Sequence, residues 1–219
     1  LFVLPVGRYA SPAVRQRVLA DFQGRRLLAG MMMTEPDFGT NIMGIETRFR
    51  AEGSGYRLGG AKHWAGLSGT AEYWLVSARK ERENGVLGRD LDFFIVRSDQ
   101  AGFDFEQSYP AAGLTSISYG LTRFDVAVSE ENKLCGPSTN IRVVYDILNR
   151  SRISISAIAS GASRRLLDEA VAWASKRVVF GKPLLAYEQV QHRLATIQAV
   201  STICSSACAF AGSLLDAYE

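Results

Sequence analysis

A loop rich in hydroxyl groups and glycine is the part of the sequence best suited to holding a polar ligand. Residues 33–41 read MTEPDFGTN and follow a short apolar run. Thr34 and Thr40 offer hydroxyl groups, and Gly39 leaves the backbone N–H groups around it unobstructed. A loop of this kind, taken alone, is more often an ordinary turn. Its function therefore depends on the residues that the fold brings beside it.

A second candidate site lies where a helical pattern stops. Residues 177–184 read RVVFGKPL, and glycine and proline both interrupt helices. Arg177, beside this break, carries the planar set of N–H donors that binds phosphate groups. The alternative is an exposed cation that interacts favourably with the helix dipole.

The sequence indicates neither a metal site, a nucleic-acid-binding surface nor a membrane span. Three cysteines (Cys135, Cys204, Cys208) and two histidines (His63, His192) have no spacing typical of metal ligands. A net charge of +3 without a dense basic run argues against nucleic-acid binding. No window reaches the ~18 uninterrupted apolar residues of a membrane span. We expect a soluble, cytoplasmic protein.

The chain changes character twice along its length. Residues 11–28 predict a helix, with Pro12 in its first turn and apolar residues at helical spacing. From Met31 to about Val128, short aromatic and β-branched runs alternate with turns, including a hairpin connection at residues 52–55. After Gly136 the helical period returns, over residues 140–175 and again from Glu188.

These changes predict an α+β protein of several modules. We expect the end of an N-terminal helical domain at residues 1–28 and an all-β, barrel-like middle domain at residues 29–136. Residues 137–219 would then contribute the first long antiparallel helices of an up-and-down helical bundle. Two such helices can pack against each other on one side only, so their other apolar faces stay uncovered. They therefore require further helices of the same chain or another subunit.

Four separated motifs resemble, in their order, those of the acyl-CoA dehydrogenase and oxidase superfamily. Residues 33–41 resemble its Thr-Glu-Pro-x-x-Gly-Ser-Asp signature, and residues 60–64, GAKHW, resemble Gly-x-Lys-x-Trp. Residues 149–152, NRSR, resemble the start of the long helix that meets the CoA portion of the substrate. Residues 164–184 resemble the hallmark of the helical domain. The resemblance extends over essentially the whole chain.

The resemblance implies an FAD enzyme that α,β-dehydrogenates an acyl thioester, bound to CoA or to an acyl carrier protein. The residues it assigns to FAD are Met33, Thr34, Gly39, Thr40, Trp64, Gly66, Arg177 and Phe180. The residues it assigns to the substrate are Thr40, Asn149 and Arg152. In this family the arginine and the phenylalanine reach the FAD of a neighbouring subunit, which implies a homodimer or a homotetramer.

Two departures from the family pattern leave the electron acceptor open between a flavoprotein and O2. Residues 64–66, WAG, replace Trp-Ile-Thr, so that a backbone N–H takes the place of a threonine hydroxyl group. These residues and residues 39–47, GTNIMGIET, resemble acyl-CoA oxidases instead. An acyl-CoA oxidase is therefore an alternative to a dehydrogenase.

A third departure concerns the catalytic base. Most of the family has a glutamate late in the helical domain, and a branch has it where Ser151 stands here. We therefore assign no catalytic residue within residues 1–219 and expect the base beyond them, with the chain a part of a longer protein. A non-catalytic scaffold of the same fold is the alternative that a missing base favours.

Overall fold

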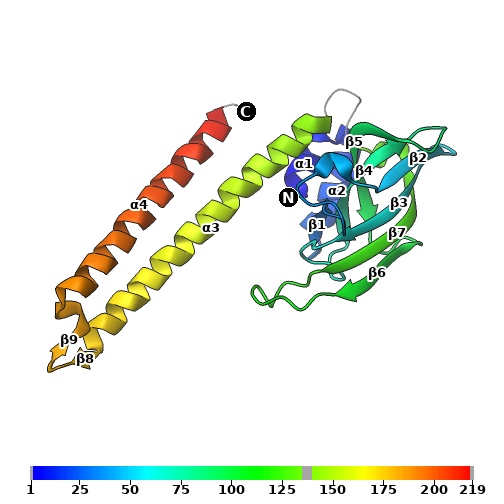
Figure 1. Cartoon of the computed structure of the whole chain (residues 1–219). Helices are drawn as coiled ribbons and strands as arrows, with labels where there is room; N and C mark the ends of the chain where they lie inside the picture. The colour runs from blue at the N-terminus through cyan, green and yellow to red at the C-terminus, as the bar shows by residue number, and fades with distance from the viewer. Residues whose placement is uncertain (1, 135–139, 218–219) are drawn as a thin grey trace. The chain divides into compact units, whose positions relative to one another are not determined.

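The computed structural model describes residues 2–134 and 140–217 (Figure 1). The chain divides into two compact units, residues 1–147 and residues 148–219. The elements of the first unit are α1 (Val3–Tyr9), α2 (Pro12–Gln23), β1 (Ala29–Met32), η1 (Ile42–Gly44), β2 (Arg48–Glu52), β3 (Gly55–His63), β4 (Tyr73–Glu81), β5 (Leu87–Arg97), β6 (Phe103–Ser108), β7 (Gly120–Ser129) and η2 (Glu130–Asn132). The boundary falls within α3 (Asn140–Lys176), after which follow β8 (Val178–Val179), β9 (Lys182–Pro183), η3 (Leu184–Ala186) and α4 (Glu188–Ala217).

Two helices open the chain, where the sequence predicts one. Helix α2 begins at Pro12, and the side chain of Ser11 accepts a hydrogen bond from the N–H of Val14 at 3.3 Å. A proline in the first turn after a serine cap is a favourable helix start. The helix ends at Gln23, before Gly24, and so does not reach residue 28. Helix α1 is too short to show a helical period in the sequence.

One curled sheet of seven strands forms the middle of the first unit (Figure 1). Its strand order is β1-β4-β2-β3-β7-β6, and β5 pairs with β4. Strand β4 is parallel to β1 and β2 and antiparallel to β5. The predicted hairpin is present, because β2 and β3 pair antiparallel up to Glu52 and Gly55, around Gly53 at φ 59°. The predicted α+β fold with a barrel-like β domain is confirmed.

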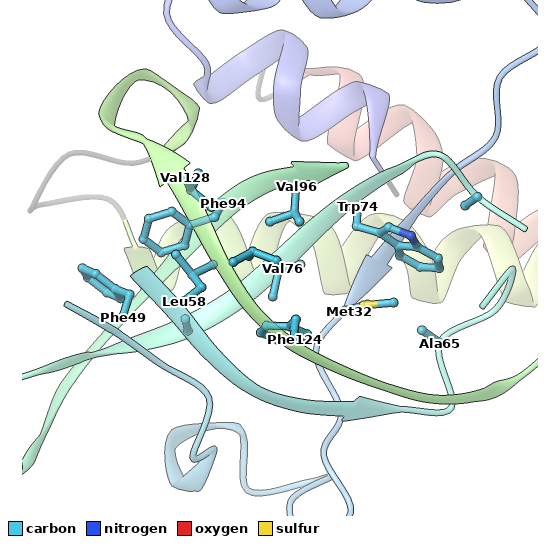
Figure 2. Packing of buried hydrophobic residues seen from close by; sticks show 13 residues of the cluster. Met32, Phe49, Leu58, Ala65, Trp74, Val76, Phe94, Val96, Phe124 and Val128 are labelled. Atoms are coloured by element: carbon cyan, nitrogen blue, oxygen red, sulfur yellow. The ribbon is translucent and has the colours of Figure 1, made fainter. Parts of the chain in front are cut away.

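The core of the first unit lies inside this curled sheet (Figure 2). Its large buried side chains are Met32, Phe49, Leu58, Trp74, Val76, Phe94, Val96, Phe124, Val126 and Val128. Strand β7 alternates between buried and exposed residues, whereas β4 and β5 each contain an uninterrupted buried run. The short aromatic runs of the sequence are therefore strands covered on both faces.

The second unit is a helical hairpin, in which α4 returns antiparallel to α3 (Figure 1). Ser160, Leu167 and Ala174 are the buried residues of α3 in this unit, seven positions apart, as expected for a helix–helix seam. The hydroxyl groups of Ser160 and Ser205 lie 2.7 Å apart. Many large apolar side chains of both helices stay exposed in this unit, including Ile158, Trp173, Ile203 and Phe210.

Helix α4 is unusually apolar. Within the described residues, one segment, Glu188–Leu215, is long and apolar enough to cross a membrane. Length and composition alone are weak evidence, because the core helix of a soluble protein meets the same criteria. The absence of a membrane span therefore stays a prediction.

Candidate functional site

The loop after β1 is closed by a pair of backbone hydrogen bonds. The N–H of Glu35 donates to the carbonyl oxygen of Phe38 at 2.9 Å, and the N–H of Phe38 donates to that of Glu35 at 3.2 Å. A Cβ atom on Gly39 would lie 3.9 Å from Cγ2 of Thr34, so these two residues are neighbours. Thr34 is half-buried and Thr40 is exposed. The loop therefore has a defined shape and an accessible polar surface.

The buried carboxylate of Glu35 anchors this loop to the segment that follows it. Glu35 is only 4% exposed. Its Oε2 accepts a hydrogen bond from the N–H of Glu46 at 2.5 Å, and its Oε1 accepts one from the N–H of Thr47 at 2.9 Å. Backbone donors satisfy a buried carboxylate and also fix its orientation. The loop is thereby tied to the segment that leads into β2.

Lys62, near the end of β3, completes the buried cluster. Its side chain is fully buried, and its ammonium group lies 2.8 Å from Oε1 of Glu35. The same Nζ donates to the carbonyl oxygen of Met33 and to the hydroxyl group of Ser77, each at 3.0 Å. A lysine ammonium has three donors, and each of them has an acceptor here.

The pKa values of this pair follow from its surroundings. Burial alone would raise the pKa of Glu35, but the charge of Lys62 and the hydrogen bonds to the carboxylate outweigh burial and lower it. Burial lowers the pKa of Lys62 to about 8, against the opposing effect of Glu35. Both groups are charged at neutral pH. A paired carboxylate with a lowered pKa is a poor proton acceptor, so Glu35 is not suited to be a catalytic base.

Trp64 stands directly after β3 and is presented to solvent. Its side chain is 52% exposed, and its backbone has φ 57°, a conformation that residues other than glycine seldom adopt. The N–H of His63 donates to the carbonyl oxygen of Thr34 at 2.9 Å, and that of Trp64 to Gly120 at 3.1 Å. These bonds place the indole beside the loop at residues 33–41. Within the described residues, Trp64 is therefore not part of the hydrophobic core.

Aromatic side chains support Trp64 from the loop that follows β6. The Tyr109 ring centroid lies 4.7 Å from that of Trp64, and the Tyr119 centroid lies 6.3 Å away. Gly66 lies next to the same loop, since a Cβ atom there would be 3.6 Å from the ring of Tyr119. Burial lowers the pKa of His63, although the charges of Asp37 and Glu35 oppose this effect. The result is an aromatic surface with one open face.

Arg177 and Phe180 lie at the turn between the helices of the second unit. The exposed Arg177 follows the end of α3, with its N–H bonded to the carbonyl oxygen of Trp173 at 2.9 Å. Strands β8 and β9 form a two-residue hairpin around Phe180, at φ 47°, and Gly181, at φ 80°. Positive φ at both positions is typical of a type I′ turn. The turn leaves Phe180 96% exposed.

Asn149 and Arg152 meet one helical turn apart on α3. The Arg152 guanidinium donates to Oδ1 of Asn149 at 3.2 Å, and both residues are exposed. About 38 Å separates Arg152 from Arg177 along the helix, at ~1.5 Å per residue. The structure thus brings together Asn149 with Arg152, and Arg177 with Phe180, but not the two pairs with each other.

The sequence analysis missed three residues that build the first unit's site: Glu35, Lys62 and Tyr109. A signal for Lys62 exists, because it shares one strand face with buried Leu58 at an even spacing. An ionisable residue at such a position requires a buried partner. Tyr109 carries no local signal, since its contact with Trp64 depends on the pairing of β3 with β7 and of β6 with β7.

Metal ligands do not cluster in the part of the chain that the structure describes. No group of three or more His, Cys, Asp or Glu side chains there could hold a metal ion. Cys204 is exposed and Cys208 is half-buried, both on α4. Cys135 lies outside the described residues.

A curled β-sheet that presents a polar loop beside an exposed tryptophan, followed by a long helical hairpin, defines a two-module α+β protein. Residues 30–127 match the acyl-CoA dehydrogenase middle domain, and residues 141–219 match the acyl-CoA dehydrogenase C-terminal domain. The chain therefore belongs to the acyl-CoA dehydrogenase superfamily.

Individual relatives agree with this membership. A probable acyl-CoA dehydrogenase of Mycobacterium tuberculosis is 29% identical over 80% of this chain and 27% of its own length. A short-chain-specific acyl-CoA dehydrogenase of Megasphaera elsdenii is 28% identical over 89% of this chain and 51% of its own. The structure of a glutaryl-CoA dehydrogenase of Mycobacterium smegmatis in complex with FADH2 has a TM-score of 0.81 and 26% identity, over 96% of this chain and 52% of that one. The chain thus spans between about a quarter and a half of these relatives.

Proposed function

We propose that this chain forms a flavin-binding part of an enzyme that uses FAD to α,β-dehydrogenate an acyl thioester, with acyl-CoA as the preferred substrate. The observation that carries the proposal is the junction of Thr34 and Trp64, made by the 2.9 Å hydrogen bond from His63. It joins the two motifs that the family places at the flavin. A relative described in complex with FADH2 supports the same cofactor.

The residues present fit FAD. The isoalloxazine ring requires a flat apolar wall with a few donors beside it. The exposed indole of Trp64 offers such a wall, and the backbone bond from His63 to Thr34 brings the loop that carries the Thr34 hydroxyl group close to it in the chain. Met33, Gly39, Thr40 and Gly66 add backbone and hydroxyl groups around that wall. The pyrophosphate requires a cation, which the exposed Arg177 supplies. When bound, FAD supplies the acceptor for a hydride from the β carbon of the thioester.

The substrate is assigned to Thr40, Asn149 and Arg152. Arg152 and Asn149 form a hydrogen-bonded polar pair suited to the CoA portion. The phosphates and amide groups of CoA need hydrogen-bond donors of this kind. The α proton requires a base. Glu35 is committed to Lys62, so the base is sought outside the described residues.

We propose further that two subunits share each flavin, in a homodimer or a homotetramer. A flavin and a thioester that react must touch each other. Arg152, in the pair with Asn149, and Arg177 are separated by roughly 38 Å along the helix. This separation supports the arrangement that the family resemblance implies, in which Arg177 and Phe180 of one chain reach the FAD of a neighbouring subunit. The exposed apolar side chains of α3 and α4 agree with a further covering partner.

An absorption spectrum of the purified holoprotein tests the cofactor and the reaction together. We expect a flavin spectrum that bleaches when one member of an acyl-CoA panel is added without air. If only an acyl-carrier-protein thioester bleaches it, the substrate is carrier-bound. A protein that stays colourless after incubation with FAD would contradict the proposal and leave the scaffold alternative.

The rate of reoxidation distinguishes the two enzyme classes. The stretches at residues 39–47 and 64–66 favour an oxidase, in which the bleached flavin recovers within seconds of readmitting air. Slow recovery, accelerated by an electron-transfer flavoprotein, would identify a dehydrogenase. The predicted cytoplasmic location belongs to the same proposal and agrees with either class.

Co-expression of two defective chains tests the sharing of FAD. We expect Trp64→Ala and Arg177→Ala each to retain less flavin than the wild-type protein when produced alone, at an FAD concentration below the dissociation constant of either variant. In a mixed dimer, one site carries both substitutions and the other carries neither. Mixed oligomers should therefore recover flavin in about half of their sites. No recovery would place Trp64 and Arg177 of one chain in the same site.

A further inference from the structure

We propose that Glu35 and Lys62 act as one positioning pair, which holds together the two walls of the site. These walls are the loop at residues 33–41 and the end of β3 with the residues after it, 62–66. The inference rests on the proposed flavin function, because the walls must stay in register only if a ligand spans them. Neither residue touches the ligand surface, since both are buried.

The Glu35 side of the pair fixes the loop to the sheet. Its two carboxylate oxygens accept the N–H groups of Glu46 and Thr47. The carbonyl oxygen of Thr47 in turn accepts the N–H of Arg79 on β4 at 2.8 Å. A shift of Glu35 therefore breaks a chain of bonds that runs from the ligand loop into the central strand.

The Lys62 side of the pair fixes the end of β3 to the loop. Lys62 reaches the carbonyl oxygen of Met33, at the start of the loop, and the hydroxyl group of Ser77 on β4. The next residue, His63, donates its N–H to Thr34, and the residue after that is the exposed Trp64. The end of β3, which leads to Trp64, is thus tied to the start of the loop by one ammonium group and one backbone hydrogen bond.

A buried ion pair is better suited to this role than to stabilising the fold. The free-energy cost of removing two charges from water offsets most of their mutual attraction. Apolar residues of the same size would therefore often stabilise the fold equally well. Apolar side chains, however, lack direction. Five directed hydrogen bonds meet at this pair, two at Glu35 from backbone N–H groups and three from Lys62. They specify one arrangement of the two walls.

The first experiment compares Lys62→Met with a matched control, Lys133→Met, by hydrogen exchange on the full-length protein without added flavin. Lys133 forms an ion pair with Asp92 at 2.8 Å in the same unit, also largely buried. This pair touches neither wall in the described contacts. We expect Lys62→Met to accelerate exchange in peptides covering residues 33–47 and 60–67, and Lys133→Met to leave both segments unchanged.

The second experiment measures FAD affinity of the same variants, scaled to the folded fraction. We expect Lys62→Met to weaken FAD binding on the order of tenfold or more, because a loosened site loses preorganisation. Lys133→Met should bind FAD as the wild-type protein does. Equal losses in the two variants, or unchanged exchange in Lys62→Met, would overturn the positioning role.

The double variant Glu35→Gln with Lys62→Met separates positioning from stability. It removes both charges, so we expect it to melt at a higher temperature than Lys62→Met alone. The N–H groups of Glu46 and Thr47 bond to different oxygens of Glu35, and glutamine has an NH2 donor in place of one of them, so one N–H loses its acceptor. Fast exchange at residues 33–47 and weak FAD binding should therefore persist. If slow exchange and tight FAD binding both returned in the double variant, the pair would act only through the stability of the fold. A wild-type protein that binds no FAD, with exchange still altered, would contradict the proposed function and confine the pair to the fold.

Discussion

The N–H of His63 donates a hydrogen bond to the carbonyl oxygen of Thr34 at 2.9 Å, and this bond joins two motifs that are distant in the sequence. It places an exposed indole at the edge of a hydroxyl-rich loop. The geometry depends on the end of β3 and the residue that follows it, where Gly60, Lys62 and Trp64 differ in what they contribute. Gly60 allows close approach to Thr47, Lys62 anchors the loop, and Trp64 is exposed beside it.

Gly60 is predicted to tolerate no side chain. A Cβ atom there would lie 2.7 Å from Oγ1 and 2.9 Å from Cα of Thr47, whereas one on Gly59 would meet nothing closer than 4.0 Å. We expect Gly60→Ala to lower the free energy of unfolding by about 1–3 kcal/mol through overpacking. Gly59→Ala is the control and should stay within about 1 kcal/mol. Urea titrations measure the free energy of unfolding of both variants. Equal losses in the two variants would contradict the close approach of Gly60 to Thr47.

Trp64 is predicted to contribute to the flavin site and little to the core. Since the indole is half exposed, Trp64→Ala should leave the melting temperature nearly unchanged. It should alter the absorption spectrum of the bound flavin and weaken FAD binding about tenfold, or ~1.4 kcal/mol. Spectral titration with FAD is the measurement. A large loss of thermal stability with an unchanged spectrum would assign Trp64 to packing instead.

Arg177 is predicted to act as an anion clamp. Arg177→Ala removes a charge-assisted contact to the pyrophosphate, which is worth about 1.5–3 kcal/mol. FAD should therefore dissociate about ten to a hundred times more readily, while the exposed position leaves the fold intact. Arg164→Ala, at another exposed position of α3, is the control. Flavin fluorescence measures FAD retention and thermal melts measure stability in both variants. If Arg177→Ala lost FAD and stability in parallel, the clamp role would be refuted.

Phe180 is predicted to lower the stability of the fold while it contributes to FAD binding. Its φ of 47° costs a non-glycine residue about 1 kcal/mol, and its side chain is 96% exposed. Phe180→Gly should therefore raise the free energy of unfolding or leave it unchanged, while FAD retention falls. Opposite signs in the two measurements are the expected signature. If FAD retention is unchanged, Phe180 has no part in binding.

Acid pH is predicted to weaken the fold through Glu35. Its pKa is lowered from 4.5 in the folded protein, so the folded state holds its proton less tightly than the unfolded state does. The resulting stability is fully present above pH ~4.5 and is lost as the pH falls through the lower, folded pKa. Glu35→Gln has no such proton to bind. Its free energy of unfolding should therefore fall less steeply with acid than that of the wild-type protein, and identical slopes would exclude this role.

Sequence alone determined the elements whose causes are local. Apolar periods, a proline at the start of α2 and the Phe180–Pro183 break predict the long helices and the strands, because each depends on residues within a few positions. The motifs also predicted that one loop and one tryptophan would share a site, and the structure joins these two segments by a backbone hydrogen bond.

Only the tertiary structure decided how those residues are held. The partner of Lys62 is distant in the sequence, and no period or turn signal can pair it with Glu35. The exposure of Trp64 depends on Gly120 and Tyr109, which pairing of β3 with β7 and of β6 with β7 brings beside it. Long-range pairing sets these contacts because burial and hydrogen bonding reward the chain only after distant strands have met. The sequence therefore predicted which residues face a ligand, and only the fold showed the buried charges beside them.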